Sequence, residues 1–200
     1  MQLLGRHPFR SQAGFTLLEA LVIMAIVLLL LAIPAMIVPG VITAARADSG
    51  SSQLLAALRT AREQAVTERR NIIVRFIAPD VLEVWREDLD VTNTGAIIVS
   101  GETLLSTTRL EQRMEFVRFN GTVPDTPDGF APGPAAVSFT GTDPWRFTSE
   151  GTLVSQSGDV VNGTVFLGRP NEPLTARAVT LFGATALLRE WKWNGGQWYE

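Results

Sequence analysis

A single carboxylate stands at the edge of a long apolar segment near the start of the chain. Glu19 ends the hexapeptide Gly14-Phe15-Thr16-Leu17-Leu18-Glu19, and no charged residue follows from Ala20 to Ala45. A carboxylate within a membrane costs roughly 2.5 to 3.5 kcal/mol on insertion scales, so such a group usually has a partner or a function. A carboxylate at this end of the segment is also within reach of the headgroup region. The pattern favours a processing site followed by a functional acid.

The segment that follows Glu19 is long enough to span a bilayer. Its 26 uncharged residues reach roughly 39 Å as a helix, which exceeds the roughly 30 Å hydrocarbon core. Pro34 and Pro39 lie within it. Each proline removes a helical hydrogen bond, so we expect a kink or a local opening of the helix there. The residues before the segment include Arg6 and Arg10 and no acid, which predicts a cytoplasmic amino terminus and a head on the other side of the membrane.

The hexapeptide, its basic leader and the apolar segment together resemble the class III signal of type IV prepilins and type II secretion pseudopilins. The resemblance implies that a prepilin peptidase cuts between Gly14 and Phe15 and methylates the new amine of Phe15. It also implies that Glu19 pairs with the terminal amine of a neighbouring subunit. Two buried charges that pair in this way cost far less than either would alone. The apolar segment lies after the cut, so it would remain on the processed chain.

The composition excludes several kinds of chemistry. The 200 residues contain no cysteine, and the single histidine is His7, within the predicted leader. A processed chain would therefore lack the residues of a Ser-His-Asp or Cys-His site and of a histidine-ligated zinc. We expect no catalytic residue, no metal and no cofactor. A hydrophobic content of 46% over this length allows one anchor and one globular domain.

The sequence predicts four regions and an α+β fold. We expect a cleaved leader at 1–14, a transmembrane or filament-core helix at 15–45, an amphipathic helix at 46–70 and a β-rich head at 71–200. Residues 48–52 are either a hinge or a soft turn of one long helix. The apolar positions Leu54, Leu58, Ala61 and Ala65 recur at helical spacing, with Leu55 and Val66 widening the stripe that should pack under the head's sheet.

After Asn71 the hydrophobic period becomes alternating, which is typical of strands. We expect strands at 72–77, 81–86, 97–99, 115–119, 136–139, 164–167, 178–181 and 185–193. Ala78-Pro79-Asp80 should form a tight hairpin turn, and residues 120–134, rich in proline and glycine, should form a long loop. Short antiparallel strands in this number indicate one or two packed sheets, a sandwich-like head on the long helix.

The order of these elements resembles the minor pseudopilins of the GspH/FimT family more narrowly. In that family an Ala-, Leu- and Arg-rich helix passes directly into strands, as Leu54 to Phe76 does here. The Phe-x-x-x-Gly element of the family matches Phe147 to Gly151, and its final strand, glycine turn and last strand resemble Ala176 to Gly183 followed by Thr185 to Trp193. The resemblance implies a pilin-like head carried by the long helix.

One departure from the family bears on function. Fimbrial members that bind DNA carry a Gly-Arg-x-Arg-like turn before the last strand, whereas this chain has Gly183-Ala184-Thr185-Ala186. Residues 71–200 hold 10 basic and 16 acidic residues, a net charge of about −6. DNA binding draws much of its affinity from neutralised phosphates, so an acidic head argues against a nucleic-acid partner.

Two further clusters have alternative interpretations. The segment Trp191 to Tyr199 holds three tryptophans that could stack on bases or sugars, although a terminal hairpin with cross-strand aromatic pairs explains it better. The oxygen-rich residues Asp88 to Asn93 could hold calcium. The glycine and distal glutamate of an EF-hand are missing, which favours a polar loop between strands.

These observations predict a non-catalytic minor pseudopilin at or near the tip of a type II secretion pseudopilus. The resemblance implies as partners a prepilin peptidase, other major and minor pseudopilins or pilins, and an inner-membrane assembly platform. It also implies a single-pass location in the bacterial inner membrane before assembly. The alternative is a minor pilin of a type IV pilus that acts in pilus assembly or DNA uptake. A third class is an anchored enzyme or sugar-binding module that joins no filament.

Overall fold

The computed structural model describes residues 16–200, apart from the side chains of residues 32–39. The predicted leader and the predicted cleavage and methylation residues Gly14 and Phe15 lie outside the described residues. The chain divides into two compact units, Met1–Val41 and Ile42–Glu200.

One helix, α1, runs over Leu17–Glu68. It continues without interruption through residues 48–52, so that stretch is part of one long helix and not a break in it. The hydroxyl of Ser51 lies 3.2 Å from the carbonyl of Ala47 and 3.1 Å from that of Asp48, so this polar side chain stays close to the backbone of its own helix. Pro34 and Pro39 also lie within α1, and the kink at these residues stays a prediction.

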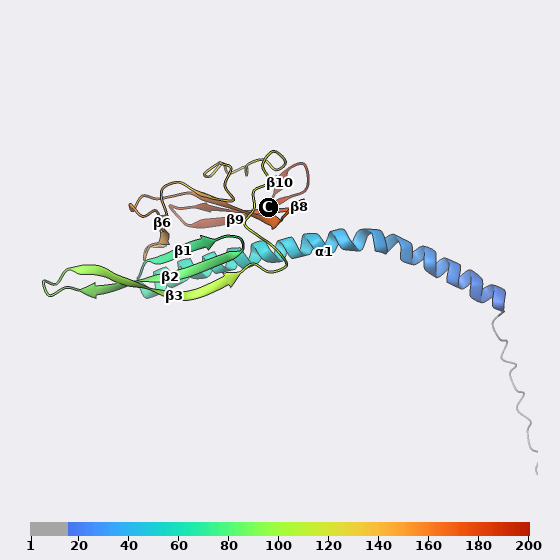
Figure 1. The fold of residues 1–200 in the computed structure, drawn as a ribbon, viewed down its shortest axis with the longest axis horizontal. Coiled ribbons are helices and arrows are strands. Elements are labelled where there is room, and N and C mark those ends of the chain that lie inside the picture. The colour runs from blue at the N-terminus through green and yellow to red at the C-terminus, as the bar shows by residue number, and fades with distance from the viewer. Residues whose placement is uncertain (1–15) are drawn as a thin grey trace, which may run out of the picture. The chain divides into compact units, whose positions relative to one another are not determined.

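The first sheet of the head is antiparallel and has the order β3-β2-β1-β5-β6. Its strands are β1 (Ile72–Ile77), β2 (Val81–Val91), β3 (Ile97–Arg109), β5 (Trp145–Phe147) and β6 (Leu153–Val154). The predicted turn at residues 78–80 is confirmed, because Ile77 pairs with Val81 directly across it. β2 and β3 continue together past the end of β1 (Figure 1).

The second sheet is also antiparallel, with the order β10-β9-β8-β7-β4. Its strands are β4 (Val137–Phe139), β7 (Gly163–Arg169), β8 (Glu172–Phe182), β9 (Leu187–Trp193) and β10 (Trp198–Tyr199). A long helix followed by two antiparallel sheets confirms the α+β prediction. No strand forms within residues 120–134, as expected for a long loop.

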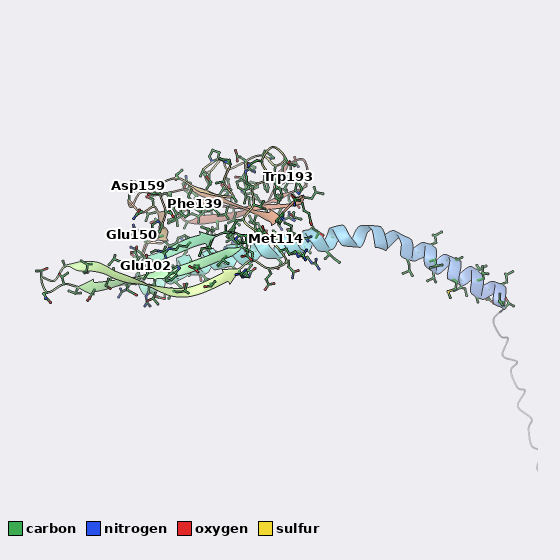
Figure 2. The ribbon with its side chains drawn as sticks, viewed as in Figure 1. Glu102, Met114, Phe139, Glu150, Asp159 and Trp193 are labelled. Atoms are coloured by element: carbon green, nitrogen blue, oxygen red, sulfur yellow. The ribbon has the colours of Figure 1, made fainter. Side chains whose placement is uncertain are left out.

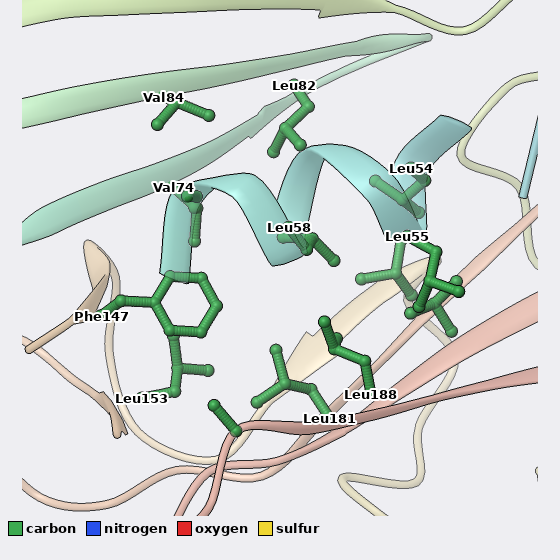
Figure 3. Close-up of a cluster of buried hydrophobic side chains, with 14 of the residues drawn as sticks. Leu54, Leu55, Leu58, Val74, Leu82, Val84, Phe147, Leu153, Leu181 and Leu188 are labelled. Carbon is green, nitrogen blue, oxygen red and sulfur yellow. The ribbon is translucent and has the colours of Figure 1, made fainter. Parts of the chain in front are cut away.

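The main core of the second unit joins α1 to both sheets. The predicted stripe of Leu54, Leu58, Ala61 and Ala65 is fully buried. It packs in one cluster with residues of the first sheet, among them Val74, Leu82, Val84 and Phe147, and of the second, among them Val165, Val179, Leu181 and Leu188. In Figure 3, Leu82 and Val84 lie on one side of the helix, and Leu181 and Leu188 lie on the other. This part of α1 therefore packs against both sheets, one on each side of the helix.

Several local predictions were wrong. Val66 is 47% exposed and does not widen the buried stripe, whereas Leu55, at 9% exposed, does. Residues 115–119 form no strand. Glu115 makes only an isolated bridge to Gly168, since β4 pairs with the earlier part of β7 from Gly163 to Val165.

Other corrections concern the ends of strands. β3 extends to Arg109 because it pairs with β2 along nearly its whole length. Residues 88–91, expected in a loop, belong to β2, and Thr185 lies in the turn before β9 and not in the strand. The short strands β5 and β6 were missed.

Candidate processing and assembly site

The start of α1 is held by a side-chain cap. The backbone N–H of Glu19 donates to the Thr16 hydroxyl at 3.2 Å, and the N–H of Ala20 donates to the Thr16 carbonyl at 3.1 Å. Thr16 followed by Glu19 three residues later is the spacing of a capping box, and a carboxylate in the first turn is favoured by the helix dipole. Sequence reasoning missed this local role, although the Thr-x-x-Glu spacing was there to indicate it.

The carboxylate of Glu19 is solvent-exposed. Within residues 16–200, no cation lies close enough to form an ion pair with it. Its predicted partner is the amine of Phe15 on a neighbouring subunit, and Phe15 lies outside the described residues. The pairing therefore stays a prediction. The hydrogen bond to Thr16 uses the backbone N–H of Glu19, so it does not depend on the carboxylate.

Behind Glu19, the surface of α1 is apolar on all sides. Leu17 is 84% exposed and Leu18 is 74% exposed, and ten more large apolar side chains are exposed by the end of this stretch at Leu31. Figure 2 shows side chains leaving this part of the helix on both sides. A helix on the surface of a soluble protein carries apolar residues on one face only, whereas one that is apolar all round is normally buried. Extended exposed apolar surface of this kind marks an interaction site.

Among the described residues, no helix reaches the combination of length and hydropathy that crossing a membrane requires.

In the second unit, polar contacts fasten α1 to the second sheet. Arg177 on β8 has a side chain that is only 3% exposed, and its Nε donates to Asp48 Oδ1 of α1 at 2.7 Å. Its Nη2 also donates to the carbonyl of Ala44 at 3.5 Å. One helical turn further on, the Ser51 hydroxyl donates to Glu190 Oε1 at 2.5 Å. These contacts fix the rotation and the register of this part of α1 against β8 and β9.

The carboxy-terminal tryptophans belong to the fold. Trp191, Trp193 and Trp198 are each at most 9% exposed. The rings of Trp193 and Trp198 lie 5.5 Å apart in an edge arrangement across the β9–β10 hairpin. The Trp198 indole donates to the carbonyl of Pro124 at 3.1 Å, so the pair also holds the long loop. The hairpin interpretation is confirmed, and the rings offer no open stacking platform.

The oxygen-rich segment that begins at Asp88 is engaged in strand contacts. Asp88 accepts hydrogen bonds from the Thr103 hydroxyl at 2.5 Å and from Arg86 Nε at 3.1 Å. The hydrogen bond from Thr103 is the main cause that lowers the pKa of Asp88 below its ordinary value, and Arg86 adds to it. Asp90 accepts from the N–H of Val91 at 2.7 Å. Across residues 16–200, no three acidic, histidine or cysteine side chains gather in a way that could hold a metal ion.

The turn before the last long strand has basic neighbours that the sequence did not reveal. A hollow beside Thr185 to Leu188 is lined by Arg59, Arg62 and Glu63 of α1. Arg62 Nε also donates to the carbonyl of Gly151 at 3.2 Å. The first cation after the turn, Arg189, already pairs with the buried Asp128 at 2.9 Å. Helical spacing places Arg59 and Arg62 on one face of α1, but only the fold brings that face to the turn.

Comparisons with known proteins agree with the amino-terminal prediction. The prokaryotic N-terminal methylation motif matches residues 9–33, a range that includes Gly14, Phe15 and Glu19. The match agrees with the predicted signal, because the hexapeptide lies within the matched range. The individual roles of the three residues stay predictions.

No curated protein is similar enough to the chain to count as a match. Among solved structures, the chain is similar to the minor pseudopilin EpsH from the type 2 secretion system of Vibrio cholerae. The identity is 14%, the match covers 72% of this chain and 94% of that one, and the TM-score is 0.40. A TM-score of that size is too low to show a shared fold.

Proposed function

We propose that the chain is a minor pseudopilin subunit that is cut between Gly14 and Phe15, methylated on Phe15 and assembled into a type II secretion pseudopilus. The observation that carries this proposal is the exposed apolar surface of α1 from Leu17 to Leu31, which lies within the range that matches the N-terminal methylation motif. Such a surface needs either lipid or other apolar helices around it. A membrane provides the first environment and a filament core provides the second.

Before assembly, the proposed subunit is held in the inner membrane by residues 15–45, with its amino terminus in the cytoplasm and its head outside. The prepilin peptidase and the inner-membrane assembly platform act on it there. In the filament, neighbouring subunits pack around α1 through head-to-tail contacts, which extend an assembly and do not close it. The head acts as a structural subunit at or near the tip and performs no catalysis.

Glu19 is the residue that tests the proposal. Glu19→Gln removes the charge, but glutamine at this position can still complete a capping box. This variant therefore separates the proposed pairing with a terminal amine from the local capping of α1. We expect Glu19→Gln to be cut and methylated normally and to be lost from the filament. A matched control is Glu63→Gln, which removes an exposed carboxylate from the same helix far from the motif.

The measurement uses cells that express the whole secretion machine. Mass spectrometry of the processed chain reports cleavage and methylation, and crosslinking with antibody detection reports incorporation into sheared filaments. Thr16→Ala removes the capping hydroxyl but leaves the charge, and a loss of the cap costs about 1 kcal/mol of helix stability. If Glu19→Gln enters filaments as well as the unaltered chain does, the amine-pairing role is wrong.

A minor pilin for DNA uptake is the second candidate, and Arg59 and Arg62 favour it. They place cations beside the turn that occupies the position of the family's basic turn. Fluorescence anisotropy of the full chain in detergent, with labelled duplex at low and moderate salt, decides between the two functions. Binding that weakens steeply with salt and is lost in Arg59→Ala supports DNA uptake. We expect no such binding, because the surrounding head is acidic.

A further inference from the structure

The β2–β3 hairpin projects beyond the sheet to which it belongs. β1 pairs with β2 only from Val81 to Arg86, whereas β2 and β3 remain paired out to Val91 and Ile97. Residues 87–102, which we call the arm, therefore have no third strand beside them (Figure 1). A two-stranded hairpin is marginally stable in water unless another element packs on it. Packing of a partner on the arm would therefore stabilise it.

One face of the outer arm is apolar. Leu89 pairs with Val99, and Val91 pairs with Ile97. Paired residues point to the same side of a hairpin, and so do residues two apart on one strand. The four side chains therefore share a face. Leu89 is 39% exposed, Val99 56%, Val91 64% and Ile97 69%. They form a continuous apolar surface that nothing in the described chain covers.

The free edge of the arm is open for pairing. β3 is the last strand of its sheet, and β2 is its only neighbour within the described chain. Natural edge strands usually avoid association by carrying charges, prolines, β-bulges or a short length. The register of β3 against β2 shifts once within the arm, between Asp88 and Leu89, and the pairing is regular beyond that shift, from Val99 to Ile97. β3 has 13 residues, and between Ile97 and Thr108 it contains no proline and a single charge, Glu102. Figure 2 shows Glu102 near the place where the arm leaves the rest of the sheet, so the outer edge is uncharged.

The charge of the arm selects the kind of partner. Residues 87–102 contain four carboxylates and no lysine, arginine or histidine. Three of these carboxylates pair with Arg146, Arg86 and Arg75. The fourth, Asp90, has no cation partner among the described residues and lies close to the tip. An anionic lipid surface and a second acidic arm are both disfavoured, because like charges repel.

From this combination we infer that the arm binds an extended strand of a neighbouring filament subunit. That strand pairs with the free edge of β3, packs apolar side chains on the face made by Leu89, Val91, Ile97 and Val99, and places a lysine or arginine near Asp90. Strand addition of this kind takes its affinity from backbone hydrogen bonds and its specificity from side chains. The identity of the partner as a filament subunit rests on the proposed function, whereas the chemistry of the arm does not.

The test uses the full chain in detergent micelles and three synthetic peptides. Each peptide has a core of alternating valine and threonine. The first is flanked by lysine and arginine, the second by glutamate, and the third has the basic flanks with N-methylated amides along one edge. We expect the first peptide to bind, and the other two to bind at least about tenfold more weakly in fluorescence anisotropy, which corresponds to about 1.4 kcal/mol.

Two double variants locate the binding site. Ile97→Ser with Val99→Ser should weaken binding of the basic peptide by at least about tenfold. The matched control is Leu174→Ser with Leu187→Ser, which changes two apolar side chains of the second sheet that are 66% and 50% exposed. The control should bind the peptide as the unaltered chain does. Thermal unfolding of both variants checks that the head remains folded.

Three results would overturn the inference: no binding of the basic peptide, equal binding of the acidic peptide, or no effect of the arm variant. The assay contains no filament, so its failure says nothing against the role of Glu19 in assembly. Conversely, loss of the assembly role of Glu19 would leave peptide binding to the arm unchanged. The two proposals can therefore fail separately.

Discussion

Replacing Leu58 with alanine should destabilise the second unit by about 3 kcal/mol. Leu58 is 1% exposed and belongs to the cluster in which α1 meets both sheets. The substitution removes three carbon atoms from an apolar site, which at about 0.8 kcal/mol each gives roughly 2.4 kcal/mol. A cavity adds to this cost where the surroundings cannot collapse. Contacts on both sides of the helix restrain such a collapse, so we expect a total of about 3 to 4 kcal/mol.

The assay is urea unfolding of the full chain in detergent, followed by tryptophan fluorescence. All five tryptophans lie in the second unit, at positions 85, 145, 191, 193 and 198, so the signal reports the unfolding of that unit alone. The matched control is Val66→Ala. Val66 lies on the same helix, but it is 47% exposed, and we expect its loss to cost less than about 1 kcal/mol.

The comparison can refute the packing described here. A cost below about 1 kcal/mol for Leu58→Ala would mean that the helix is not enclosed by the two sheets. An equal loss of unfolding free energy in Leu58→Ala and Val66→Ala would mean that Val66 is also buried, as the sequence alone predicted.

Three further predictions follow from single contacts. Asp48→Ala should cost about 2 to 3 kcal/mol in the same unfolding assay and more than Arg177→Met, because it leaves a buried guanidinium without its carboxylate. Gly183→Ala should cost at least about 1 to 3 kcal/mol, since its Cβ would lie 1.9 Å from the carbonyl oxygen of Val161. The pKa of Asp88 in the folded chain should lie below the ordinary pKa of an aspartate in an NMR titration. The stability that its contacts contribute is therefore fully present above the ordinary pKa and is lost as the pH falls through the lower folded pKa.

Each of these predictions has its own control. Gly101→Ala places a Cβ in open space and should change stability far less than Gly183→Ala. Thr103→Val removes the hydroxyl that donates to Asp88, so the pKa of Asp88 should rise toward its ordinary value. An unchanged Asp88 titration in that variant would show that Thr103 is not the main cause. A larger loss for Arg177→Met than for Asp48→Ala would show that the guanidinium stabilises mainly through backbone carbonyls.

Features set by neighbours in sequence could be predicted. The turn at residues 78–80, the buried stripe of α1 and the β9–β10 hairpin all follow from short-range periodicity and turn chemistry. The N-terminal methylation motif is readable for the same reason, because it is one continuous segment of the sequence.

Features set by distant pairing could not be predicted. β5 has three residues and is defined by its register with β1, in which Ile72 pairs with Phe147. Residues 115–119 look like a strand by alternation, but their pairing with β7 is limited to the bridge between Glu115 and Gly168 and one hydrogen bond from Val117 to Phe166, because β4 pairs with the earlier part of β7. Likewise, Asp128 accepts from the Trp191 indole at 2.9 Å and pairs with Arg189, contacts that no local pattern in the sequence indicates.

α1 carries two different apolar surfaces, one buried within the head and one exposed. Between Leu54 and Ala65 the apolar residues form one stripe that the head's own sheets bury. Between Leu17 and Leu31 they cover every side of the helix and remain exposed. The sheets of the same chain bury the stripe completely. A helix that is apolar on every side is buried only when lipid or the helices of other molecules surround it. Substitutions in the stripe should therefore change unfolding of the isolated chain, and substitutions such as Leu28→Ser should leave that unfolding unchanged and act only on insertion or assembly.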